Sequence, residues 1–157
     1  MNLGIQIDKD FRKSLNREWL QRVVEQSLTV QDFNSEVELS LVITNKETMQ
    51  RLNQQYRGID EPTDVLSFAL TEGIPGDDNP FIIPPDGILH LGEVVICYPK
   101  VVIQAEENKQ SIEQELALLV VHGVLHLLGY EHDEPDREKE MRVLQEKVLL
   151  EIEKRLK

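Results

Sequence analysis

Cysteine is almost missing from this chain: its single example, Cys97, cannot form an intramolecular disulfide bond. This usage fits a reducing compartment, and the first residues lack the basic, then apolar, then small-residue order of a secretory signal. Long hydrophobic runs are missing too. The apolar stretch over residues 116–128 is too short to span a bilayer and predicts a buried core helix. We therefore expect a cytoplasmic protein with no membrane partner.

Basic residues are scarce: 17 lysines and arginines stand against 29 acidic residues, and the net charge is −12 at pH 7. A generic nucleic-acid binder is normally basic, so the composition argues against that class. An enzyme with a local positive cleft is not excluded, because much of the negative charge follows Glu131, where a solvated helix face can hold it. A chain of 157 residues can bury a real core, and we expect a single domain over residues 1–157.

Hydrophobic periodicity divides the chain into strands and helices without an internal repeat. Period-two alternation predicts strands at about residues 3–7, 36–44, 65–69 and 89–97, and helical spacing predicts helices at about 16–27, 45–56, 98–108, 111–128 and 135–155. The segment at 71–87 is rich in proline and glycine and is expected to be a loop. This order predicts an α+β fold with a mixed sheet of about four strands packed with helices.

Three of the four histidines lie between residues 122 and 132. His122 and His126 are one helical turn apart on the same face, with Cβ atoms about 6 Å from each other. Gly129 can end that helix in a left-handed conformation, so the chain can turn back and bring His132 over the pair. Three protein ligands leave the fourth position of a tetrahedral zinc open, as in catalytic sites. We predict one Zn²⁺ per chain at the end of the central helix, although nickel, iron or another divalent ion would also accept imidazoles.

Other polar residues have simpler interpretations. Zincin proteases place a glutamate general base directly after the first histidine, and this chain has Gly123 there, which argues against a protease. His90 is expected to be a structural or surface residue and not a metal ligand. Glu93, in an apolar strand, is either a charge at a strand edge or a partner that orients a metal-binding histidine. Thr63, Asp64 and Ser67 are expected to cap turns.

Three stretches together resemble the bacterial YbeY family of endoribonucleases and ribosomal-RNA maturation factors. The histidine segment at 122–132 reads HGVLHLLGYEH, the segment at 53–68 reads NQQYRGIDEPTDVLSF, and the segment at 91–96 reads LGEVVI. They occur in the family's order and spacing, and the resemblance covers about residues 36–150. One departure is Glu131, where the family usually has aspartate before the last histidine, which weakens any role of this carboxylate in orienting a ligand.

The resemblance implies a zinc-dependent endoribonuclease, specific for single strands, that acts in ribosomal-RNA maturation and ribosome quality control. Its partners would be single-stranded ribosomal-RNA precursors and the ribosome or a ribosomal protein. The family's zinc ligands correspond to His122, His126 and His132, and its functionally important arginine corresponds to Arg57. Without the resemblance, Arg57 reads as a solvated surface charge; with it, the planar guanidinium would bind phosphate oxygens and offset developing negative charge.

Several alternatives stay open at this point. The nucleophile is either a water activated by the metal or the 2′-hydroxyl of the RNA. A metal-dependent hydrolase of a small molecule or peptide would use the same site. A ribosome-associated binding factor would hold a structural zinc and would catalyse no reaction.

Overall fold

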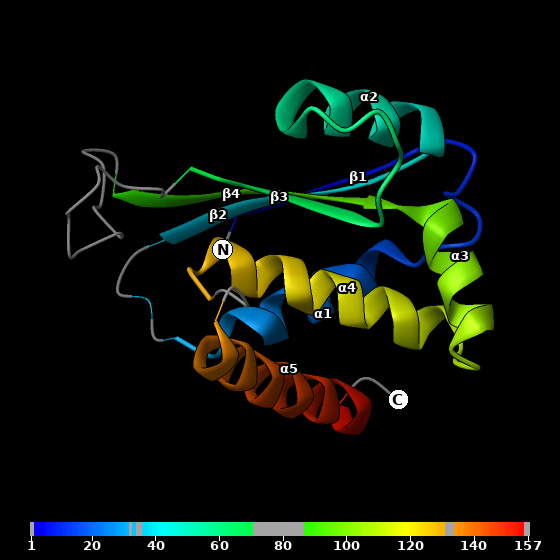
Figure 1. Ribbon diagram of the computed structural model, residues 1–157. Coiled ribbons are helices and arrows are strands. Elements are labelled where there is room, and N and C mark those ends of the chain that lie inside the picture. The colour runs from blue at the N-terminus through cyan, green and yellow to red at the C-terminus, as the bar shows by residue number, and fades with distance from the viewer. Residues whose placement is uncertain (1, 32, 34–35, 71–86, 131–133, 156–157) are drawn as a thin grey trace.

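The computed structural model describes residues 2–31, 33, 36–70, 87–130 and 134–155 (Figure 1). Strands and helices follow one another in the order β1 (Asn2–Ile7), α1 (Arg17–Leu28), β2 (Glu36–Thr44), α2 (Lys46–Arg57), β3 (Val65–Ala69), β4 (Ile88–Cys97), α3 (Tyr98–Glu107), α4 (Ile112–Leu127) and α5 (Pro135–Arg155). Each predicted element is present, with ends that agree to within one residue, and the α+β class is confirmed. Most of the predicted 71–87 loop lies outside the described residues. Within the described ranges, no helix is both long and apolar enough to cross a membrane.

The four strands form one mixed sheet in the order β1-β2-β4-β3. Strands β1, β2 and β4 run parallel, and β3 pairs antiparallel with β4 at one edge. Figure 1 shows α1, α4 and α5 on one face of this sheet and α2 alone on the other, with α4 between the sheet and α5. The central helix therefore packs on both sides, as its apolar sequence predicted.

Alternating strand residues build a separate core on each face of the sheet, because successive side chains of a strand point in opposite directions. The large core joins the sheet to α1, α4 and α5 and includes Leu91 and Val94 of β4. The smaller core lies on the opposite face, that of α2, and consists of Met49, Leu66, Val95 and Cys97.

Local signals fix the ends of the helices. The α4 cap is a complete capping box, in which the Gln114 N–H donates to Ser111 Oγ and the Ser111 N–H donates to Gln114 Oε1, each at 3.0 Å. Asn16 and Asn45 cap α1 and α2, because the side-chain oxygen of each accepts a hydrogen bond from a main-chain N–H group in the first turn. In β4, Gly92 has φ of 134°, and a Cβ there would lie 2.0 Å from the Phe68 carbonyl oxygen, so only glycine allows this close backbone approach.

Candidate metal centre

The two histidines of α4 lie in its last two turns and are half-buried, whereas the residues around them are part of the core. Val121, Val124 and Leu125 are completely shielded from solvent. A helix that is packed this firmly against the sheet and α5 fixes the positions of the side chains that it presents. The local sequence thus provides a rigid base for a pair of imidazoles.

The imidazoles of His122 and His126 converge at their Nε2 atoms, which are 3.1 Å apart. Their ring centroids are 4.6 Å apart and the rings are inclined at 80°. Two nitrogen ligands of a tetrahedral zinc, with bonds near 2.0–2.1 Å, are separated by about 3.3 Å. The pair therefore fits one shared metal ion with little adjustment.

Gln145 of α5 orients the first of these histidines. Its Oε1 lies 3.0 Å from His122 Nδ1. Because an amide oxygen only accepts hydrogen bonds, this arrangement places the ring proton on Nδ1 and makes Nε2 the nitrogen that can bind a metal. Such a partner is typical of metal-binding histidines. Sequence reasoning missed Gln145, which reads as one more polar residue of an amphipathic helix.

The end of α4 turns back as Gly129 predicted. The Gly129 N–H donates to the His126 carbonyl and the Tyr130 N–H donates to the Leu125 carbonyl, both at 3.0 Å, with Gly129 at φ of 96°. These two bonds form a Schellman motif. His132 and Glu131 lie outside the described residues, so the third ligand stays a prediction. In the part of the chain that is described, no group of three histidine, cysteine, aspartate or glutamate side chains is placed to hold a metal.

Gly123, between the histidines, faces the sheet. A Cβ at this position would lie 2.6 Å from Val94 Cγ1 and 3.4 Å from Ser67 Oγ. The Ser67 hydroxyl also donates to the Gly123 carbonyl at 3.2 Å, so Ser67 does more than cap a turn. A side chain at 123 would therefore run into Val94 and Ser67, so the position has no room for the glutamate of a zincin protease.

Arg57 is the last residue of α2 and is exposed. The adjoining segment is held in place: the Asn53 amide donates to the Glu61 carbonyl at 2.8 Å, and the Gln50 amide donates to Asp60 Oδ1 at 3.0 Å. Since α2 and α4 cover opposite faces of the sheet, the fold does not bring Arg57 and the histidine pair together on one face (Figure 1). The role assigned to Arg57 stays a prediction.

Glu93 and His90 also belong to the α2 face. Glu93 pairs with Phe68 across the strands and follows Gly92, while its neighbour Val94 points toward α4. His90 Nδ1 lies 3.1 Å from Glu38 Oε1, which agrees with a structural or superficial role. Glu93 therefore does not orient either histidine of α4, where Gln145 has that position for His122, and its relation to His132 lies outside the described residues.

Comparisons with known proteins agree with this arrangement. The family model described as Endoribonuclease YbeY matches residues 4–153. The Endoribonuclease YbeY of Roseiflexus castenholzii is 44% identical over 148 residues, which cover 94% of this chain and 90% of that protein. The protein of the same name from Brevibacillus brevis is 46% identical over 136 residues, with coverage of 85% and 84%.

Similarity extends to a solved structure. The solution structure of TM1509 from Thermotoga maritima has a TM-score of 0.59 and 30% identity, and the match covers 96% of this chain and 88% of that chain. The family match over nearly the whole sequence, together with relatives above 40% identity, confirms what the three motifs predicted. The chain belongs to the YbeY family.

Proposed function

We propose that this protein is a metal-dependent endoribonuclease that cleaves single-stranded RNA in the maturation of ribosomal RNA. The observation that carries the proposal is the convergence of His122 and His126, whose Nε2 atoms lie 3.1 Å apart. Family membership supplies the reaction class, since the relatives are named as endoribonucleases.

The metal would be held by His122 and His126, with His132 as the third ligand that the family resemblance implies. Zinc is the first candidate because imidazole nitrogens suit it, while nickel and iron would accept the same donors. A bound divalent ion supplies Lewis acidity toward a phosphoryl oxygen. The Gln145 amide keeps the His122 ring in one orientation and one tautomer.

Phosphate binding and charge stabilisation are assigned to this chain's own residues, and the nucleophile is either a water molecule or a hydroxyl group of the RNA. The Arg57 guanidinium is suited to binding two phosphate oxygens at once and to stabilising the charge that develops during phosphoryl transfer. The nucleophile is either water or the 2′-hydroxyl. A 2′,3′-cyclic phosphate on the product would identify the hydroxyl, and a simple terminal phosphate would identify water.

The partners follow from the same proposal. RNA is the substrate, and the ribosome or a ribosomal protein in the cytoplasm brings the enzyme to it. A net charge of −12 leaves phosphate binding to a few local cations, of which Arg51, Arg57 and Lys100 are on the described helices. The same charge favours an additional protein partner, so a non-catalytic binding factor with a structural metal is the second candidate.

Metal removal separates the two candidates. The protein is stripped with a chelator, refilled with Zn²⁺ or Ni²⁺, and assayed on single-stranded and duplex forms of one labelled RNA, with circular dichroism recorded at each step. We expect cleavage of the single strand to disappear and return with the metal while the spectrum stays unchanged, because α4 is held by apolar packing. Unfolding on chelation, with no cleavage after refilling, would favour the binding factor.

A further inference from the structure

The sheet face opposite the histidine pair contains a cavity of 310 Å³. Its polar and aromatic lining comes from β2, the end of α2, β3 and β4, and includes Glu38, Ser40, Tyr56, Phe68, His90 and Glu93. A few polar groups around aromatic side chains, in a cavity of this size, are typical of a site for a small planar ligand.

The aromatic part of the cavity is open to solvent. Tyr56 is 60% exposed, and its ring lies 4.9 Å from that of Phe68, centroid to centroid, at an angle of 59°. Leu70, at 72% exposed, extends the same surface. Aromatic side chains that stay exposed beside a cavity are the usual platform on which unstacked RNA bases lie.

The polar part of the cavity accepts hydrogen bonds. Glu38 already interacts with His90, whose Nδ1 is 3.1 Å from its carboxylate. Glu93 lies across from Phe68 in the strand register, and among the described residues no side chain or main-chain group hydrogen-bonds its carboxylate. A carboxylate beside an aromatic ring matches a base whose edge carries N–H groups. Guanine presents adjacent imino and amino donors, whereas uracil flanks its one N–H with two carbonyl oxygens that a carboxylate repels.

We propose that this cavity binds one base of the single-stranded RNA substrate, with guanine preferred over uracil. The exposed Tyr56 ring stacks on the base, the inclined Phe68 ring supports Tyr56 from the sheet, and the Glu93 carboxylate accepts hydrogen bonds from the edge of the base. The inference rests on the proposed endoribonuclease function and names a site that determines which RNA is bound.

The cavity and the histidine pair lie on opposite faces of the sheet, and strand β3 contributes to both. Ser67 of β3 contacts Gly123, which follows His122, while the next residue, Phe68, lines the cavity. Because β3 is at the edge of the sheet, one strand of RNA can pass around it without crossing the core. A base in the cavity and a phosphate at the histidine pair can therefore belong to the same RNA strand.

The charged side chains in and around the cavity favour a base inside it and phosphates outside it. Glu38 and Glu93 disfavour a phosphate inside the cavity, so only the base enters. Arg57 follows Tyr56 directly and is exposed, and Arg51, six residues earlier on α2, is exposed as well. These two cations are available to the phosphates outside.

Binding of short 2′-O-methyl oligonucleotides tests the site on the full, zinc-loaded chain. The pentamers UUGUU and UUUUU are titrated, and their integrity is checked afterwards. We expect wild type to bind UUGUU about 10-fold more tightly, the discrimination of one well-made polar base contact. Glu93→Gln should remove this preference, and Tyr56→Leu should weaken binding of both pentamers.

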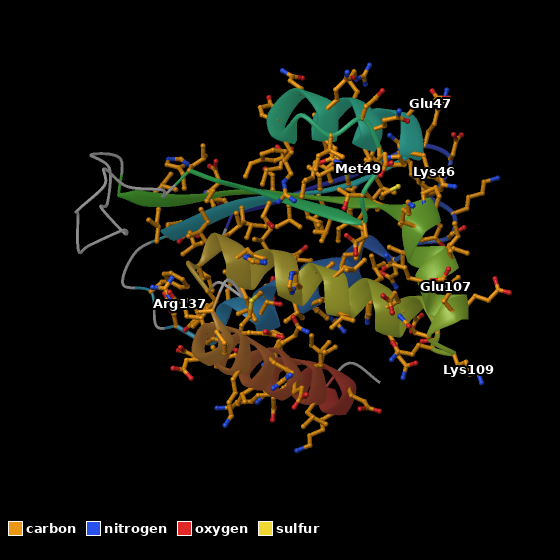
Figure 2. The ribbon with its side chains drawn as sticks, viewed as in Figure 1. Lys46, Glu47, Met49, Glu107, Lys109 and Arg137 are labelled. Atoms are coloured by element: carbon orange, nitrogen blue, oxygen red, sulfur yellow. The ribbon has the colours of Figure 1, made fainter. Side chains whose placement is uncertain are left out.

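Glu47→Gln is the matched control, since it makes the same change of charge at the other end of α2 (Figure 2). It should bind both pentamers as wild type does, and thermal melting confirms that every variant is folded. Equal affinity of wild type for the two pentamers, or a preference that survives Glu93→Gln, overturns the base site. If the protein cleaves RNA with metal but shows no base preference, the endoribonuclease proposal stands and the base site is wrong. If it binds RNA with a base preference but does not cleave it, the base site stands and the endoribonuclease proposal is wrong.

Discussion

The side chains of His122 and Gln145 meet between α4 and α5, with Oε1 of the glutamine 3.0 Å from Nδ1 of the histidine. This contact joins the last helix of the chain to the imidazole pair. It gives Gln145 a role that neither composition nor motif spacing indicated. If His122 binds a metal through Nε2, removal of the amide frees the ring to rotate and to change tautomer.

Gln145→Leu should weaken zinc affinity about 10- to 100-fold, as is usual when the partner of a metal-binding histidine is lost. A competition titration against a chelating dye measures the affinity, and ¹⁵N spectra of the metal-free protein report the His122 tautomer. Glu146→Leu, at the exposed neighbouring position, is the control and should bind zinc normally. A Gln145→Leu protein with wild-type affinity and tautomer would show that the contact is incidental.

Gly123→Ala should lower the free energy of unfolding by about 1–3 kcal/mol, the usual cost of overpacking a core. Alanine normally favours a helix, yet here its Cβ would lie 2.6 Å from Cγ1 of Val94, a stiff and fully buried side chain. Urea unfolding measures the loss. Combined with Val94→Ala, the substitution should cost less than the sum of the two single changes. A Gly123→Ala protein as stable as wild type would contradict the packing argument.

Arg57→Ala should reduce RNA cleavage about 10²- to 10³-fold while the bound metal stays at the wild-type amount. The guanidinium would act on phosphate and not on the histidines, so metal binding should not depend on it. Lys46→Ala removes a positive charge from the opposite end of α2 and should leave cleavage unchanged (Figure 2). Wild-type cleavage by a folded Arg57→Ala protein would remove this residue from the mechanism.

Burial raises the pKa of the Cys97 thiol above its ordinary value of 9.0, against a smaller opposing effect of Lys100. The thiolate is the reactive form, so iodoacetamide should leave the native protein unmodified at pH 8 and modify it in urea. The unfolded thiol ionises at lower pH than the native one. Stability should therefore fall as pH rises above 9.0 and level off beyond the native pKa. Cys97→Ala should show a shallower fall, and equal slopes would show that the thiol does not contribute.

Local signals made most of the fold predictable. Asn16, Asn45 and Ser111 each start a helix, and Gly129 ends one, because a cap depends on a few adjacent residues. The histidine pair was predictable for the same reason, since one helical turn separates its members.

Features that depend on how elements pack could not be predicted in this way. The order β1-β2-β4-β3 and the choice of sheet face for α2 are set by long-range packing, so the separation of Arg57 from the histidines has no sequence signal. Gln145 and Glu93 have similar polar character, and only the structure shows that the first faces His122 and the second faces the opposite side.

The central claim is that the histidines of α4 hold the metal that cleavage requires. Metal content and RNA cleavage should be measured on the same preparations of wild type and His126→Ala, with folding checked by circular dichroism. We expect about one zinc per wild-type chain, and we expect metal and cleavage to be lost together in a variant that remains folded. A folded His126→Ala protein that still binds zinc and cuts RNA would contradict the account.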